Sequence, residues 1–483
     1  MPSAASVAGG PCECVEGPCT CEGDAEARAA VPEERASGAD PEAWVRQTFP
    51  ELRPPLSAAL ARAEAERCLE CGGPQAAAPC VVSCPAEIDV PGFIAAIARD
   101  DADRAAELIF AENLLGGTCA RVCPVEELCE GACVLLTEGR RPVEIARLQR
   151  FATDRALGSN RVFRRPRAST ARRVAVIGAG PAGLACAGEL AALGYQVAVY
   201  DERDEPGGLV RFAIAPYRQV RDPLPAEVKQ LSALGVELQL GSPIDSPATL
   251  RRLEAGTDAI FLGIGMGADV APAIPGADLA GVWESLQFIE ELKRGRPPRL
   301  GRHLAVIGGG NTAIDVAREA VALGVCDVTL LYRRSEAEMP AYRHEVDEAR
   351  EEGVRFSWLT QPIRFIGRDH LQAIECRRLR LGPPDASGRP RPEPVDGSEF
   401  LLPVDTAVLA IGQRPRAEFL DWIDGIEQDH GRIRVDPETG RTGNPKYFAG
   451  GDAVTGGATV VAAVRGGKRA AAGIDAALKG EVA

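Results

Sequence analysis

The 483-residue sequence is poor in histidine and in aromatic side chains, with four histidines and an aromatic fraction of 5%. So few imidazoles exclude a histidine-rich metalloenzyme, since histidine is the commonest metal ligand in proteins. Positive charge is also in deficit, because 55 lysines and arginines face 69 aspartates and glutamates, for a net charge of −14. An acidic protein of this kind disfavours nucleic acid or an anionic membrane as its main partner.

Long apolar runs are missing as well. No uncharged stretch exceeds 16 residues, and the one at residues 174–188 has 15, whereas a helix that spans a bilayer needs about 20. No basic residue precedes Arg28, and no apolar segment typical of a secretory signal comes before it. The sequence therefore predicts a cytoplasmic protein that binds no membrane.

What the sequence does have is an uneven distribution of cysteine. Twelve of the 15 cysteines lie in the first 133 residues, and in a cytoplasmic chain such clusters indicate metal ligation rather than disulfides. The others, Cys186, Cys326 and Cys376, are expected to be core or surface thiols. No closely spaced cysteine pair accompanies the nucleotide motifs described below, so a redox-active disulfide beside a flavin is not expected.

Changes in composition divide the chain into five segments and predict an α/β fold. Residues 1–50 are expected to be a disordered tail, and residues 51–165 a helical domain with cysteine-bearing loops. Residues 170–300 and 405–483 would form one Rossmann-like domain, interrupted by a second at residues 301–404. Cys12, Cys14, Cys19 and Cys21 lie in the tail and either bind one metal ion or carry no ligand.

Eight cysteines form two groups in the helical segment. The first is Cys68, Cys71, Cys80 and Cys84, and the second is Cys119, Cys123, Cys129 and Cys133. Ligands two to three residues apart, with proline after Cys84 and Cys123, are typical of ferredoxin-like [4Fe–4S] sites. Zinc is the competing ligand at such spacings.

The first nucleotide motif is a G-x-G-x-x-G turn at Gly178, Gly180 and Gly183, between a β-rich run and a helix. These glycines permit a tight turn, close approach to a pyrophosphate and helix–strand packing. Asp201 follows the next strand at the distance expected of an acid that binds ribose hydroxyls. The glycine loop at Gly207 and Gly208 comes shortly after it, which supports a dinucleotide site here.

A second turn, G-x-G-x-x-A, begins at Gly308. Its candidate contacts are Gly308, Gly310, Asn311, Thr312 and Ala313. The following strand ends in Arg333 and Arg334 instead of an acid. Guanidinium groups bind a 2′-phosphate that an acid would repel, so this site favours NADP(H) over NAD(H). The alternative is an arginine pair that is simply solvated.

A third signal lies near the C-terminus, where a strand runs into Gly451 and Asp452 and then into a helix. An aspartate in this position contacts the ribityl chain in flavin enzymes with two dinucleotide folds, so we assign it to FAD. The strand that ends at Gly412 is expected to be the crossover strand of the same domain.

Together these motifs resemble the small (β) subunit of NADPH-dependent glutamate synthase and its relatives, among them the N-terminal flavin and iron–sulfur half of dihydropyrimidine dehydrogenase. The resemblance covers about residues 55–480. The motifs that carry it are GGTCARVCP at 116–124, EGAC at 130–133, YRRSEAEMP at 332–340 and GPPDASGR at 382–389.

The resemblance implies two [4Fe–4S] clusters. One would be held by Cys68, Cys71, Cys80 and Cys133, and the other by Cys84, Cys123 and Cys129 with Gln149 as a possible fourth ligand. Cys119 matches a position that is not a ligand in the dihydropyrimidine dehydrogenase relatives. The eight residues between Cys71 and Cys80 are more than the family usually has there, so residues 72–79 are expected to bulge outward.

The resemblance also implies a function. The chain would be the electron-input subunit of an oxidoreductase, passing electrons from NADPH through FAD and the clusters to a separate catalytic subunit. The large subunit of glutamate synthase is the first candidate partner, and a dihydropyrimidine-reducing subunit the second. The alternatives are a stand-alone NADPH diaphorase or sulfide-type reductase, and a cluster-bearing scaffold with no activity.

Overall fold

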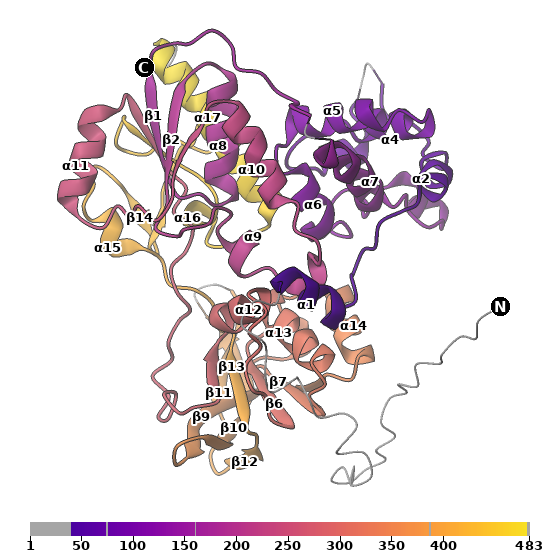
Figure 1. The fold of residues 1–483 in the computed structure, drawn as a ribbon. Helices are drawn as coiled ribbons and strands as arrows, with labels where there is room; N and C mark the ends of the chain where they lie inside the picture. The colour runs from indigo at the N-terminus through magenta and orange to yellow at the C-terminus, as the bar shows by residue number, and fades with distance from the viewer. Residues whose placement is uncertain (1–39, 74–75, 160, 386–387, 481–483) are drawn as a thin grey trace.

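A computed structural model describes residues 40–73, 76–159, 161–385 and 388–480 (Figure 1). The cysteines at positions 12, 14, 19 and 21 lie outside these ranges. The described chain has a helical N-terminal region, two five-stranded parallel sheets with their helices, a four-stranded antiparallel sheet, and a short antiparallel pair of β14 (Gln428–Asp429) with β15 (Arg432–Ile433). This architecture confirms the expected α/β class. No helix in the described ranges is both long and apolar enough to cross a bilayer.

The N-terminal region packs short helices around one apolar core. They are α2 (Ala58–Ala65), α3 (Pro79–Val82), α4 (Val90–Ala98), α5 (Ala102–Glu112), α6 (Gly116–Val122), the 3₁₀ helix η1 (Val134–Glu138) and α7 (Ile145–Gly158). Asp89 and Asp101 cap α4 and α5 by accepting hydrogen bonds from backbone N–H groups, which satisfies donors that the first turn leaves free. The core of these helices is continuous with that of the first parallel sheet.

Residues 40–50 are not part of a disordered tail, so the expected boundary at residue 50 is wrong. Helix α1 (Pro41–Thr48) begins at Asp40, whose side chain accepts a hydrogen bond from the N–H of Glu42. Trp44 and Phe49 are buried in the core of the second parallel sheet, and α1 lies beside α12 (Figure 1). The alanine- and proline-rich composition of the tail concealed these apolar anchors.

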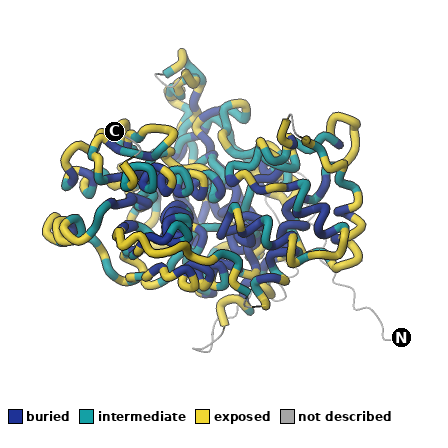
Figure 2. Tube along the Cα trace, turned by 90° about the horizontal axis from the view of Figure 1, so that it is seen from above, coloured by how far each residue is buried: buried dark blue, intermediate teal, exposed yellow. Residues whose placement is uncertain are grey.

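The first parallel sheet has the strand order β16-β4-β1-β2-β3. Its strands are β1 (Arg173–Ile177), β2 (Gln196–Tyr200), β3 (Glu237–Gln239), β4 (Ala259–Leu262) and β16 (Tyr447–Ala449). Its helices are α8 (Pro181–Ala192), α9 (Leu209–Phe212), α10 (Leu224–Ala233), α11 (Pro247–Gly256), α15 (Ala417–Leu420), α16 (Asp452–Thr455) and α17 (Val460–Lys479). All of β4 is buried, as helices on both faces require, and Figure 2 shows the buried interior.

The second parallel sheet has the order β5-β13-β6-β7-β8. Its strands are β5 (Val282–Glu284), β6 (His303–Ile307), β7 (Asp327–Leu331), β8 (Arg355–Ser357) and β13 (Thr406–Leu409), and its helices are α12 (Ser285–Lys293), α13 (Asn311–Ala322) and α14 (Arg343–Glu351). Because β5 and β13 pair with each other and β13 pairs with β6, both belong to this second domain. The expected boundaries at 300/301 and 404/405 therefore differ from the structure by β5 and α12 on one side and by β13 on the other.

The antiparallel sheet was not expected from the sequence. It consists of β9 (Thr360–Gly367), β10 (Leu371–Pro384), β11 (Pro390–Pro394) and β12 (Phe400–Pro403). Its apolar face shares a core with β6, β7 and β13 through Phe365, Ile374 and Cys376. It therefore covers one face of the second sheet, where a parallel fold would otherwise need a further helix.

Candidate cofactor-binding sites

The first glycine loop connects β1 to α8. Gly178 has a φ of +104°, and a Cβ added there would lie 2.3 Å from the carbonyl oxygen of Gly263, so no other residue fits. Gly180 caps α8, and an added Cβ would meet no atom within 4 Å. This open space at a helix N-terminus is suited to a pyrophosphate.

Asp201 and the loop at Gly207 both meet the first glycine loop. The Asp201 carboxylate accepts a hydrogen bond of 2.6 Å from the N–H of Ala179, and the N–H of Gly207 donates to the Ala179 carbonyl at 2.8 Å. A Cβ at Gly208 would lie 3.0 Å from the Cα of Gly180. The structure thus brings together the candidate contacts of the first nucleotide site.

The third glycine signal reaches the same place from the C-terminal part of the chain. Gly451 has a φ of +71°, and a Cβ there would lie 2.8 Å from the Cβ of Ala182 in the first turn of α8. Asp452 begins α16 and accepts a hydrogen bond of 3.2 Å from the N–H of Ala458. Burial raises the pKa of Asp452 and this hydrogen bond opposes the rise. These residues fit a dinucleotide such as FAD, because the glycine turns leave space at the N-terminus of α8.

The second glycine loop repeats this geometry between β6 and α13. Gly308 has a φ of +150°, and an added Cβ would lie 2.1 Å from the carbonyl oxygen of Ala410. Gly310 caps α13 and faces open space. The helix begins with Asn311, Thr312 and Ala313. Gly412 follows β13 and so lies in the second domain, where its carbonyl accepts a hydrogen bond from Val270.

The two arginines after β7 have different environments. Arg333 is exposed, whereas Arg334 is 2% exposed. Arg334 donates from Nη2 to the Asp385 carboxylate and from Nε to the Pro390 carbonyl, both at 2.9 Å. Arg334 is thus tied to the antiparallel sheet, and of the two arginines only Arg333 is exposed.

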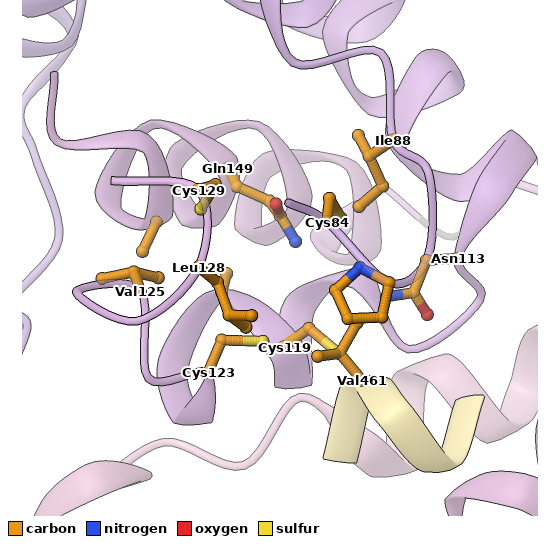
Figure 3. A pocket seen from close by; sticks show the side chains of 13 residues that line it. Cys84, Ile88, Asn113, Cys119, Cys123, Val125, Leu128, Cys129, Gln149 and Val461 are labelled. Atoms are coloured by element: carbon orange, nitrogen blue, oxygen red, sulfur yellow. The ribbon is translucent and has the colours of Figure 1, made fainter. Parts of the chain in front are cut away.

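The cysteines of the helical region line two cavities. The inner cavity is lined by Cys84, Cys119, Cys123, Cys129 and Gln149, among others (Figure 3). The outer cavity is lined by Cys68, Cys71, Cys80 and Cys133, with apolar neighbours. This division coincides with the two ligand sets that the resemblance implies. Cys119 is an additional thiol at the inner cavity.

Burial controls the ionisation of these thiols. It raises the pKa of Cys80 to about 11 and also raises the pKa values of Cys68, Cys84 and Cys129. For Cys123 the hydrogen bond with Cys119 raises the pKa first, and burial adds to it. A bound cation would stabilise the thiolates and release the protons.

Backbone N–H groups also surround the inner cavity. Those of Ala86, Glu87 and Ile88 point at the Cys84 sulfur, where they oppose the effect of burial on its pKa. Hydrogen bonds of this kind to ligand sulfurs are typical of iron–sulfur sites. No three histidine, cysteine or acidic side chains in the described ranges lie close enough to share a single metal ion. The fit to iron–sulfur clusters therefore rests on the two thiol-lined cavities and these N–H groups.

Despite the long spacer between Cys71 and Cys80, Cys80 lies with the other candidate ligands of the outer cavity. Gly73 and Ala76 exchange backbone hydrogen bonds of 3.0 and 3.3 Å. The spacer is therefore held together at Gly73 and Ala76, and Cys80 lines the outer cavity together with Cys133.

Sequence reasoning missed three residues from the first dinucleotide domain that reach the inner cavity or its walls. Val461 of α17 lines the cavity (Figure 3). Glu227 of α10 and Lys468 of α17 bind the backbone of the helical region. No local pattern marks them, because each contacts residues more than 100 positions away.

Comparisons with known proteins agree with this organisation. A family model described as pyridine nucleotide-disulphide oxidoreductase matches residues 172–467, more than half of the chain. A second model, described as dihydropyrimidine dehydrogenase domain II, 4Fe-4S cluster, matches residues 45–161. The solved structure of Mycobacterium tuberculosis FprA in complex with NADPH is similar in fold, with a TM-score of 0.53 and 19% identity over 64% of this chain and 85% of that one.

Several curated relatives are similar over most of the chain. The glutamate synthase [NADPH] small chain of Halomonas elongata is 38% identical, over 88% of this chain and 92% of its own length. The putative oxidoreductase AegA of Escherichia coli is also 38% identical, but this chain spans 67% of it. For the NADP(+)-dependent formate dehydrogenase subunit beta of Moorella thermoacetica, also 38% identical, the span is 60%. The chain therefore belongs to the pyridine nucleotide-disulphide oxidoreductases and, within them, to the family of the NADPH-dependent glutamate synthase small chains.

Proposed function

We propose that the chain is the electron-input subunit of a cytoplasmic oxidoreductase. It would bind FAD in the first dinucleotide domain, NADPH in the second, and one [4Fe–4S] cluster in each of the inner and outer cavities. When bound, these groups would supply hydride acceptance from NADPH and single-electron transfer. The acceptor would be a separate catalytic subunit, with the large subunit of glutamate synthase as the first candidate.

One observation carries this proposal. The inner cavity, with three of the candidate cysteine ligands, is closed on one side by Val461 of α17. Helix α17 packs along α8, the helix that the first glycine loop begins. The thiols therefore lie next to the domain that would hold the flavin, as electron transfer between the two sites requires.

Different residues of the chain would bind the pyrophosphates and select the coenzyme. Gly180 and Gly310 leave room for the pyrophosphates, and the N-termini of α8 and α13 face them with partial positive charge. Exposed Arg333 would select the 2′-phosphate of NADPH. The outer cavity is lined only by residues of the helical region, so the cluster in it would be the one that passes electrons to a partner.

Anaerobic purification followed by cofactor analysis tests the proposal. We expect one FAD and about eight irons, with matching sulfide, in each chain. NADPH should reduce an artificial dye with the chain alone, and glutamate should form from glutamine and 2-oxoglutarate only after the large subunit is added. A single zinc without sulfide would refute the cluster sites. Turnover with a dihydropyrimidine-reducing subunit instead would reassign the partner, and dye reduction with neither subunit productive would favour the stand-alone diaphorase.

A further inference from the structure

The two cavities differ in which parts of the chain build them. Every residue that lines the outer cavity lies between positions 68 and 145. The inner cavity also takes Val461, from the first dinucleotide domain. Two ionisable side chains of that same domain, Glu227 and Lys468, form hydrogen bonds with backbone groups on two different parts of the wall of the inner cavity.

Glu227 of α10 holds the first turn of α6, the helix that ends at Cys123. Its Oε1 accepts hydrogen bonds from the N–H groups of Gly117 at 2.7 Å and Thr118 at 3.0 Å, and its Oε2 accepts from the Thr118 hydroxyl at 2.5 Å. Glu227 is fully buried. A buried acid with this many donors is fixed in one geometry, because losing any of them would leave the carboxyl group unsatisfied.

The same turn of α6 is tied to Gln149 on its other side. The Gln149 Nε2 donates a hydrogen bond of 2.7 Å to the carbonyl of Gly116. Gln149 is the candidate non-cysteine ligand and lines the inner cavity (Figure 3). A continuous set of hydrogen bonds thus runs from α10, through the start of α6, to the side-chain amide at the cavity.

Lys468 of α17 holds the loop that follows Cys84. Its Nζ donates to the carbonyl of Ala86 at 3.0 Å, and to the carbonyl and carboxylate of Glu112 at 2.8 and 2.9 Å. The N–H of Ala86 points at the Cys84 sulfur. A single peptide segment is therefore bound by Lys468 on its carbonyl side and by a candidate ligand sulfur on its N–H side.

We infer that Glu227 and Lys468 are positioning residues that hold the inner cavity against the flavin-binding domain and thereby set the efficiency of electron transfer between them. The inference rests on the proposed function. The hydrogen bonds of these two residues go to Gly117, Thr118, Ala86 and Glu112 and not to a nucleotide loop, so we expect their variants to keep FAD and NADPH binding. Their effect should fall on the transfer step and on the environment of the inner cluster.

The test uses the full chain, purified anaerobically, with Lys468→Met and Glu227→Ala. Stopped-flow absorbance should show that NADPH still reduces the flavin at the normal rate. Electron transfer from the flavin onward should slow by about tenfold or more, because without these hydrogen bonds the inner cavity is no longer held in a fixed position against the flavin-binding domain. Electron paramagnetic resonance of the dithionite-reduced protein should show a changed signal from one cluster and an unchanged signal from the other.

The chain offers matched controls. Lys479 lies on the same helix and pairs with Asp475 at 2.7 Å on the surface, so Lys479→Met should match the unmodified protein. Lys468→Arg and Glu227→Gln keep most of the hydrogen bonds and should restore the transfer rate. If Lys468→Met and Glu227→Ala behave like Lys479→Met, or lower only the melting temperature, the inference is wrong. Absence of flavin and iron from the unmodified chain would instead count against the proposed function.

Discussion

The two dinucleotide domains use nearly the same loop and differ in the side chains that follow it. Gly178 and Gly308 both have positive φ, and an added Cβ would lie 2.3 Å from the carbonyl oxygen of Gly263 and 2.1 Å from that of Ala410, respectively. In the first domain Asp201 follows the next strand, β2. In the second domain Arg333 and Arg334 come shortly after the next strand, β7. Because all dinucleotides share a pyrophosphate, the loops can be alike, whereas the strand ends must distinguish one nucleotide from another.

The largest expected effect comes from placing a side chain at the first glycine of each nucleotide loop in turn. Gly178→Val should give a chain without FAD and without any NADPH oxidation, because neither the φ nor the space admits a side chain. Gly308→Val should keep its FAD and its yellow colour but lose reduction by NADPH. The flavin absorbance after gel filtration and its bleaching by NADPH measure both outcomes.

Chemical reduction provides the control for this pair. Dithionite should still bleach the flavin of Gly308→Val, since the first domain is intact. If Gly308→Val lost FAD as completely as Gly178→Val, the two loops would not serve separate nucleotides, and the comparison would fail.

The next effect concerns the charge at the end of β7. Arg333→Asp should lower kcat/KM for NADPH by about 10- to 100-fold, because a charge-assisted hydrogen bond to phosphate contributes about 1.5–3 kcal/mol. NADH should be used as well as before or better. Arg334→Ala should act differently: it removes the hydrogen bonds that Arg334 donates to Asp385 and to the Pro390 carbonyl, and should lower the melting temperature more than it changes the preference for NADPH.

Steady-state kinetics with both coenzymes, together with thermal unfolding, separates the two arginines. Equal kcat/KM for NADPH and NADH in the unmodified chain would refute the role of Arg333. If Arg334→Ala lost as much of the preference for NADPH over NADH as Arg333→Asp, the buried arginine would also contribute to binding the 2′-phosphate.

The features that sequence reasoning located well are local. The β-rich run before the first glycine turn is strand β1, and the helix expected after the turn is α8, because a β-rich run, a glycine turn and a helix are specified by adjacent residues. The division of the cysteines also coincides with the two cavities, although it came from a family resemblance. Spacing alone left zinc and iron–sulfur clusters as alternatives.

The features that it missed depend on contacts between distant segments. Helix α1 is stable because Trp44 reaches a core formed 170 or more residues later, and its own composition gave no sign of this. Strand β13 looked like part of the FAD domain until its pairing with β6 was known. Lys468 binds a carbonyl 382 positions away. No periodicity encodes such pairings, so they could be found only in the folded chain.

The smallest expected effect sharpens the comparison at the third position of each loop. A Cβ at Gly183 would lie 1.9 Å from the carbonyl oxygen of Gly178, whereas the second domain has Ala313 there, fully buried. Gly183→Ala should push α8 away from its loop, weakening FAD retention by about tenfold, the equivalent of about 1.4 kcal/mol. Ala313→Gly should cost only the helix propensity of alanine over glycine, about 1 kcal/mol of unfolding free energy, and leave NADPH affinity within about twofold. FAD released on dilution and NADPH titration of the oxidised protein measure the two effects. An unchanged FAD affinity in Gly183→Ala would mean that the first loop tolerates the same residue as the second, and that the strand ends alone separate the two domains.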